Sequence, residues 1–295
     1  KNDMQAPKQR DKLIYKELNK YLKKKKFVNN KNLKKTHYIF NENIYKILQK
    51  GKLYDFLRNS FIQKMFFVHN RFFIFKELNV LKNSKKWNFY KKLFIEDSVG
   101  NPVKYFLYPD SSGNRINHVY HLSILVEYLK INLKDINYVF EFGGGYGCMA
   151  RIFYKINKKI NNLIFDTKLV NLLQYYYLKQ NLMNVGFNKN NQFKLINKFR
   201  NLKLQKKRNS LFIANWSLSE APVIFRNKFL KHIQNYQYIC IAFQEYFEEI
   251  DNKKYFDLLK KKLLKKYDIN IIENKFYKGN ILSKQKHFFL IGTKR

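Results

Sequence analysis

The sequence predicts an α/β fold in which helices cover a mostly parallel sheet, and three observations support this prediction. From about residue 137 onward, short apolar runs alternate with helical patterns, which is typical of a parallel sheet with helices on both faces. A glycine-rich turn joins the first apolar run to the helix after it. The last two apolar runs have no helical pattern between them, so we expect a C-terminal antiparallel hairpin at one edge of a seven-stranded sheet.

Each expected element follows from its apolar periodicity. Strands are short apolar runs, and helices repeat apolar residues at intervals of three and four. The expected strands of the sheet are 138–142, 163–165, 193–196, 211–214, 238–243, 269–272 and 288–292. The expected helices between them are 148–158, 170–183, 222–232 and 255–266. A short strand at 105–108 and a helix at 118–130 are expected before the sheet.

The first 95 residues are basic and show helical patterns. Ile14 and Leu18, for example, recur at helical spacing. Glycine and proline residues between 97 and 109 then mark loops. We therefore expect a helical N-terminal region at 1–95 and a second domain at 96–295. A substrate-binding lid, an oligomerisation arm and a membrane-surface contact are all open roles for the N-terminal region.

The net charge of +38 favours anionic partners. Only nine of the 59 basic residues are arginine, however, and the chain is rich in Lys, Asn, Ile, Phe and Tyr, the residues that an AT-rich coding sequence would favour. A dedicated phosphate-binding face tends to use arginine for its bidentate geometry. We therefore favour compositional drift over a nucleic-acid surface, although attraction to anionic substrates or membrane headgroups follows in either case.

The cysteines and the hydropathy pattern bear on the compartment. Cys148 and Cys240 are far apart and form no CxxC motif, which argues against a disulfide framework or a zinc site. No run approaches the ~18 apolar residues of a membrane-spanning helix. We expect a cytoplasmic protein that acts in solution or at the inner face of the membrane, and a removed targeting segment before Lys1 stays an open alternative.

A short motif between the first expected strand and helix points to a ligand. Residues 141–147 read Glu-Phe-Gly-Gly-Gly-Tyr-Gly. Glycine tolerates the backbone angles of a sharp turn, and the missing side chains let a ligand lie against the backbone near free helix amides. The dinucleotide fingerprint G-x-G-x-x-G, aligned on Gly143 and Gly145, would place Cys148 at its third glycine, so that match fails. A turn that only packs helix on strand is the alternative.

The spacing E-x-G-x-G-x-G resembles the first motif of class I S-adenosylmethionine-dependent methyltransferases. The resemblance implies a Rossmann-like fold and S-adenosylmethionine as the cofactor, with its methionine part over the glycines and the leading acid close by. The residues expected at this cofactor are Glu141, Gly143, Gly144, Gly145, Tyr146, Gly147, Asp166, Asn215 and Trp216.

Asp166 ends the second expected strand, 25 residues after Glu141. An acid at this position can accept hydrogen bonds from both hydroxyls of a ribose, as in nucleotide-binding folds. The alternative is an N-cap for the helix that begins near Leu169. We favour ribose binding because the glycine turn and this acid occur together.

Longer stretches around the motif narrow the resemblance. Gly100-Asn101-Pro102, His121-Leu122 and the segments 174–178 and 215–222 are similar to the sugar O-methyltransferase family over about residues 95–295. In that family Asp-Leu-Pro-Glu commonly follows the second strand. Here Thr167 and Lys168 follow Asp166, which puts the role of the later glutamate in doubt. The resemblance implies a sugar or glycan hydroxyl as acceptor, on an anionic polysaccharide, a lipid-linked sugar or a nucleotide sugar.

Methyl transfer to a hydroxyl requires aligned oxygen, carbon and sulfur atoms and a group that accepts the proton. The candidates are Glu220, His118, His121 and Glu245. Glu220 follows the fourth strand, where a helix-supporting role is the alternative. The two histidines are three residues apart on one helix, although lone histidines on helices are more often packing or surface residues. A divalent metal is compatible with sugar methylation, but the sequence supplies no ligand set for one.

Two other functions stay open. A nucleic-acid methyltransferase is favoured by the charge, but residues 215–218 read Asn-Trp-Ser-Leu and lack both prolines of the [DNS]-P-P-[YFW] loop used to methylate amino nitrogens. A non-catalytic binding module on a methyltransferase fold is the other alternative. The intact glycine turn and Asp166 argue against it. The sequence does not predict an oligomeric state.

Overall fold

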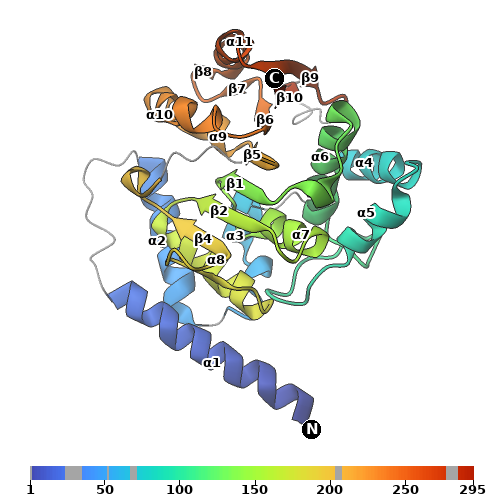
Figure 1. Ribbon diagram of the computed structural model, residues 1–295. Helices are drawn as coiled ribbons and strands as arrows, with labels where there is room; N and C mark the ends of the chain where they lie inside the picture. The colour runs from blue at the N-terminus through green and yellow to red at the C-terminus, as the bar shows by residue number, and fades with distance from the viewer. Residues whose placement is uncertain (1, 24–34, 52, 67–71, 203–207, 277–284) are drawn as a thin grey trace.

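The computed structural model describes the chain apart from residues 1, 24–34, 52, 67–71, 203–207 and 277–284 (Figure 1). A sheet of eight strands lies at its centre, in the order β3-β4-β2-β1-β5-β6-β10-β9. The strands are β1 (Tyr138–Phe142), β2 (Asn161–Phe165), β3 (Val185–Gly186), β4 (Phe193–Ile196), β5 (Ser210–Asn215), β6 (Tyr238–Gln244), β9 (Tyr267–Glu273) and β10 (His287–Lys294). All seven expected strands are present, and β3 adds two residues at one edge.

The strand directions confirm the Rossmann-like, mostly parallel sheet. β1 pairs in parallel with both β2 and β5, and β5 pairs in parallel with β6. β10 runs antiparallel to both of its neighbours, β6 and β9. The expected C-terminal hairpin therefore exists, but its second strand returns inside the sheet and leaves β9 at the edge. The chain runs outward from β1 to β2 and later restarts on the other side at β5, so the ends of β1 and β5 border the switch point where such sheets bind ligands.

Helices account for most of the remaining chain. They are α1 (Asn2–Lys23), α2 (Lys35–Lys50), α3 (Ser60–Phe66), α4 (Phe72–Lys82), α5 (Trp87–Phe94), α6 (Gly113–Leu129), α7 (Cys148–Ile156), α8 (Lys168–Gln180), α9 (Ser217–Glu220), α10 (Val223–Ile233) and α11 (Asn252–Leu263). A small separate hairpin, β7 (Tyr246–Phe247) and β8 (Ile250–Asp251), follows β6.

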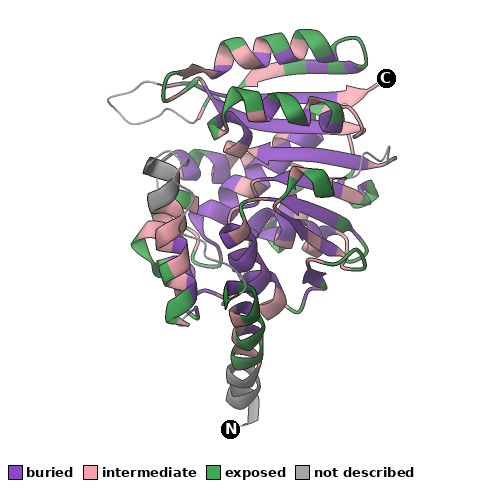
Figure 2. Cartoon of the chain, turned by 90° about the vertical axis from the view of Figure 1, so that its left-hand side faces the viewer, coloured by how far each residue is buried: buried purple, intermediate pink, exposed green. Residues whose placement is uncertain are grey.

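The sheet has a hydrophobic core on each face, as its alternating side chains require. Val139 on β1 belongs to the core built with α6, α7 and α8. Phe140, the next residue, belongs to the core built with α10 and α11. Figure 2 shows buried residues along the strands and exposed residues on the outer helices. The result is a three-layer sandwich that fixes the strand ends relative to one another.

The N-terminal helices share the first of these cores. Ile14 of α1 and Phe56 are buried in the same cluster as residues of α7 and α8. α1 lies on α8, where Tyr176 donates a hydrogen bond of 2.7 Å to Asp11, and the N-terminal end of α1 points away from the molecule in Figure 1. The domain boundary at residue 95 and the proposed roles of this region stay predictions.

Two segments before the sheet differ from expectation. Residues 105–108 form a turn closed by a single bridge between Tyr105 and Tyr108, so the strand expected there is wrong. The helix expected from residue 118 begins at Gly113, because the hydroxyl of Ser112 caps it by accepting a hydrogen bond of 3.1 Å from the Arg115 amide. The polar residues just before the expected helix thus cap it and form its first turn.

Candidate functional site

The glycine turn connects β1 to α7 through three left-handed residues. Gly143, Gly145 and Gly147 have φ angles of +69°, +54° and +104°, a region that side chains disfavour. The Gly143 amide donates to the Phe165 carbonyl at 2.8 Å, and the Gly147 amide donates to the Gly144 carbonyl at 2.9 Å. The backbone alone therefore requires glycine at these three positions, whether or not a ligand binds.

Packing explains two of the three glycines further. A Cβ on Gly143 would lie 2.2 Å from the Cβ of Ser217, and one on Gly147 would lie 3.3 Å from Leu178. At these two positions the missing side chain allows close packing of the turn against its neighbours. This is the packing role that the sequence left open as the alternative to ligand binding. A Cβ on Gly145 would meet only Phe66 of α3, at an ordinary contact distance of 3.4 Å. Gly145 is the position where the N-terminal region covers the turn.

Asp166 lies directly against this turn. It follows β2, and its carboxylate accepts hydrogen bonds from the Thr167 amide at 2.7 Å and from Gln174 Nε2 at 2.9 Å. The backbone amides of Gly144 and Gly145 also donate to it, but burial is the larger effect and raises the pKa of Asp166 to about 7. The N-cap of α8 is Thr167, so the alternative role for Asp166 as helix cap is not the one seen.

Glu141 supplies a second carboxyl group beneath the turn. Its side chain is 4% exposed, and Oε2 has no hydrogen-bond partner among the described residues. Burial, and next to it the charge of Asp166, raises the pKa of Glu141 to about 8. A Cβ on Gly144 would lie 3.3 Å from the Glu141 carboxyl carbon. The structure thus brings Glu141, Asp166 and the turn together, as the sequence predicted.

The end of β5 supplies the facing side of the site. Trp216 has φ +62° and ψ −34°, a sparsely populated conformation that costs about 1–3 kcal/mol in a residue with a side chain. Its backbone amide donates to the Ala242 carbonyl at 2.8 Å, and its indole N–H donates to His287 Nδ1 at 3.1 Å. Such strain persists only where the surroundings enforce it, which marks this strand end as a functional candidate.

The two histidines of α6 differ in their surroundings. His121 is 1% exposed, and its Nδ1 lies 3.0 Å from Asn215 Oδ1 at the end of β5. Burial lowers the pKa of His121 to about 3, and Nε2 has no partner among the described atoms. His118 Nδ1 lies 2.7 Å from the Asn114 carbonyl, and burial lowers its pKa to about 4. Both rings are neutral near pH 7, and only His121 joins the strand end.

The two glutamates expected near the acceptor have other hydrogen-bond partners. Glu220 ends α9, is exposed, and shares a hydrogen bond with Gln244. Glu245 follows β6, and its carboxylate accepts a hydrogen bond of 3.3 Å from the Lys286 amide. Their role at the acceptor stays a prediction.

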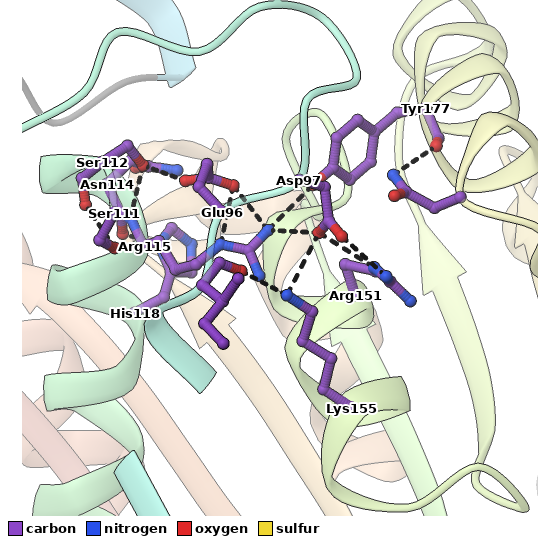
Figure 3. Close-up of polar contacts among 12 residues, drawn as sticks. Glu96, Asp97, Ser111, Ser112, Asn114, Arg115, His118, Arg151, Lys155 and Tyr177 are labelled. Carbon is purple, nitrogen blue, oxygen red and sulfur yellow. Dashed lines mark hydrogen bonds and ion pairs between the residues drawn. The ribbon is translucent and has the colours of Figure 1, made fainter. Parts of the chain in front are cut away.

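A buried ionic network next to the turn was not predicted from the sequence (Figure 3). Arg115 is fully buried and donates to Glu96 at 2.8 Å and to Asp97 at 3.0 Å. Arg151 of α7 donates to the other oxygen of Asp97 at 2.7 Å. Burial opposes ionisation of Asp97, but the hydrogen bond from Arg151 and the charges of Arg115 and Lys155 lower its pKa to about 2.

This network holds Tyr146 of the glycine turn through α8. Arg115 donates to the Tyr177 hydroxyl at 3.1 Å, and the Tyr177 ring packs edge-on against Tyr146 with 5.0 Å between centroids. Asn114 donates to the Tyr146 hydroxyl at 3.1 Å. The Tyr146 side chain is 1% exposed, and Tyr177 and Asn114 hold its ring and its hydroxyl, so it anchors the turn to the protein interior. No sequence pattern indicated this network.

The described residues contain no group of three or more His, Cys, Asp or Glu side chains that could hold a metal ion. None of the helices described combines the length and the apolar character needed to cross a membrane.

No protein-family model and no curated protein matches this sequence. Several solved structures have a similar chain course. One is a SAM-dependent methyltransferase from Aquifex aeolicus, which is 13% identical to this chain; the match covers 75% of this chain and 98% of that one, with a TM-score of 0.43. The PH0226 protein from Pyrococcus horikoshii OT3 is 13% identical, with 62% and 92% covered and a TM-score of 0.44. The methyltransferase domain of the bacterial protein CtHen1 is 8% identical, with 58% and 95% covered and a TM-score of 0.41. The fold class itself rests on the strand order described above.

Proposed function

We propose that this protein is an S-adenosylmethionine-dependent O-methyltransferase that acts on a sugar hydroxyl of a surface polysaccharide, a lipid-linked sugar or a nucleotide sugar. The observation that supports methyl transfer is the meeting of the glycine turn with two carboxyl groups, Glu141 and Asp166, at the switch point of the sheet. The sugar acceptor is the finer part of the proposal and derives from the sequence resemblance over about residues 95–295.

The polar atoms without partners at the turn fit S-adenosylmethionine as the methyl donor. Glu141 Oε2 and Gln174 Oε1 are buried without partners among the described residues, and Asp166 is a carboxylate beside them. All three offer hydrogen-bond acceptors. The ribose diol and the ammonium group of S-adenosylmethionine are donors, so the two sets are complementary. When bound, S-adenosylmethionine supplies an electrophilic methyl group on a positively charged sulfur.

His121 is the residue that we assign to the acceptor hydroxyl. Because an amide oxygen can only accept, the contact with Asn215 Oδ1 places the proton of the neutral imidazole on Nδ1. Nε2 then carries a lone pair without a partner among the described atoms. It can accept the hydrogen bond of a sugar hydroxyl and orient its oxygen, while Trp216 packs edge-on at 5.3 Å from the His121 ring. His118, Glu220 and Glu245 are secondary candidates for the proton.

Calorimetry with S-adenosylmethionine tests the donor site. The wild-type chain should bind with micromolar-scale affinity, and Asp166→Ala should weaken binding at least about tenfold, since one good hydrogen bond to a charged group contributes about 1.5–3 kcal/mol. Asp257→Ala is the matched control, because Asp257 pairs only with Lys253 on the exposed face of α11. A wild-type chain that releases no heat with the donor would refute the proposal.

A nucleic-acid methyltransferase is the second candidate, and the net charge of +38 is the observation that favours it. Neutralisation of several phosphates would make affinity for an oligonucleotide fall steeply with salt. Binding that changes little between low and physiological salt would exclude this candidate and leave the sugar acceptor as the preferred one.

A further inference from the structure

Gln174 of α8 connects the two halves of the proposed donor site. Its side chain is fully buried, and its amide nitrogen donates two hydrogen bonds of 2.9 Å. One goes to the Gly145 carbonyl in the glycine turn, and the other goes to Asp166 Oδ2 after β2. A single amide therefore sets the distance between the turn and the acid.

We infer that Gln174 is a positioning residue of the donor site, which holds the Asp166 carboxylate in register with the turn and keeps it available as an acceptor. The inference rests on the proposed function and adds a residue to it. Gln174 itself needs no contact with the reacting atoms for this role.

Space beneath the turn shows how closely these groups are placed. A Cβ on Gly144 would lie 2.8 Å from Ile164 Cγ2, 3.1 Å from Gln174 Nε2 and 3.3 Å from the Glu141 carboxyl carbon. Ile164 therefore excludes a side chain at this position, and the two polar groups lie close beside it. Glu141, Gln174 and Asp166 thus converge on Gly144, from β1, α8 and the end of β2. A shift of Gln174 would move Asp166 and the turn together.

The hydrogen bond also affects the charge of Asp166. The groups that face this carboxylate are the amides of Gly144, Gly145 and Thr167, the Gln174 side chain and the carboxyl of Glu141. Donation by Gln174 lowers the pKa of Asp166, whereas burial raises it. Removal of this donor leaves Asp166 protonated at higher pH, and a protonated carboxyl has fewer acceptor sites for a diol.

Gln174 has a matched control on the same helix. Gln180 lies six residues later on α8 and also donates to an aspartate, Asp11 of α1, at 2.8 Å. It is remote from the glycine turn in sequence and packs against α1. Gln180 is half-buried. A general need of α8 for glutamine–aspartate hydrogen bonds would show at both glutamines, whereas positioning of the donor site would show only at Gln174.

The test measures the affinity for S-adenosylhomocysteine by calorimetry between pH 5.5 and 8.5, with the full chain and the variants Gln174→Leu, Gln174→Glu and Gln180→Leu. Wild-type affinity should rise with pH as Asp166 ionises. Gln174→Leu should bind at least about tenfold more weakly. Gln174→Glu keeps the shape, but it can donate only when protonated, so its affinity should fall as pH rises. Gln180→Leu should follow the wild type.

The outcomes separate the inference from the function on which it rests. Affinity that rises with pH in Gln174→Glu as it does in wild type, or unchanged affinity in Gln174→Leu, would overturn the positioning role while leaving the donor site intact. A wild-type chain that binds no S-adenosylhomocysteine at any pH would overturn the proposed function and the inference together. If Gln174→Leu unfolds early in a thermal melt, the isosteric Gln174→Glu decides alone through the direction of its pH profile.

Discussion

Asn215 Oδ1 lies 3.0 Å from His121 Nδ1, so the end of β5 and the middle of α6 are joined by one side-chain hydrogen bond. The same contact fixes the tautomer of a buried imidazole. It gives the strand end a neutral hydrogen-bond acceptor, His121 Nε2, in a protein whose net charge is +38. A neutral acceptor suits an uncharged hydroxyl better than it suits a phosphate.

Nitrogen NMR of labelled histidine should find His121 neutral, with the proton on Nδ1, from pH 8 down to pH 5. Burial lowers its pKa to about 3 despite the opposing hydrogen bond to Asn215, so the ring stays neutral well below the range of an ordinary histidine. His121→Gln assigns the signal, and Asn215→Leu should release the tautomer. A titration midpoint near 6.5 would contradict the buried position.

Gly143→Ala should lower the free energy of unfolding by about 3 kcal/mol. The alanine would have to adopt a left-handed backbone conformation, and its Cβ would overlap Ser217. Each of these two effects costs about 1–3 kcal/mol. Ser217→Gly should recover part of the loss because it removes the overlap but not the strain. In Gly147→Ala, whose neighbours are Leu178 and Tyr177, Ser217→Gly should recover nothing. Denaturant unfolding of the four variants measures both effects, and equal recovery in the two backgrounds would disprove the direct contact.

Glu77→Gln should stabilise the protein at alkaline pH and change little near pH 5. Glu77 of α4 is fully buried, and among the described residues both of its oxygens accept from Asn117, at 3.0 and 3.1 Å. Burial raises its pKa to about 8. The folded chain therefore keeps a proton that the unfolded chain releases above about pH 4.5, and stability falls as pH rises from there to about 8.

At about 1.4 kcal/mol per pKa unit, the shift of Glu77 from 4.5 to about 8 should make the gain from Glu77→Gln at pH 8 about 4 kcal/mol. Glu42→Gln serves as a control, because Glu42 is part of an exposed pair with Lys46 and should leave the pH dependence unchanged. Unfolding free energies that differ between wild type and Glu77→Gln by the same amount at pH 5 and pH 8 would show that Glu77 does not titrate as described.

Arg115→Met should destabilise the protein by about 3–5 kcal/mol, because it leaves Glu96 buried without its counter-charge. Asp97 loses one partner but keeps its ion pairs with Arg151 and Lys155. Arg115→Lys should recover only part of this loss, since an ammonium group cannot reproduce the donors that reach Glu96, Asp97 and Tyr177. Arg208→Met, at an exposed position, should shift stability by no more than about 0.5 kcal/mol. Thermal melts compare the three variants, and equal stability of Arg115→Met and wild type would exclude a structural role for the network.

The sequence predicted the sheet well because buried strands are short apolar runs with a turn at each end. Glu141 and Asp166 were predicted to converge for a related reason: each ends one of two parallel strands, and the ends of parallel strands share one edge of the sheet. The position of β10 between β6 and β9 could not be predicted. A sheet with β9 next to β6 would contain the same antiparallel pair of β9 and β10, and tertiary packing on β6 decides between the two strand orders.

The ionic network had no sequence pattern that could reveal it. Asp97, Arg115 and Arg151 come from separate segments, and their contacts span 18 and 54 residues of sequence. Likewise, the positions of Glu220 and Glu245 after their strands did not reveal the hydrogen-bond partners of their carboxylates, which are the Gln244 side chain and the Lys286 amide. Position after a strand predicts the edge of the sheet and leaves the direction of the side chain undetermined.

A crystal structure of the protein with S-adenosylhomocysteine would examine the donor site itself. We expect the homocysteine part against the backbone of Gly145, with the Phe66 side chain displaced from its contact with this glycine, and both ribose hydroxyls within hydrogen-bond distance of the Asp166 carboxylate. A ligand bound away from this turn, or a ribose whose hydroxyls contact other residues while Asp166 keeps only Gln174 and the backbone amides, would contradict the account.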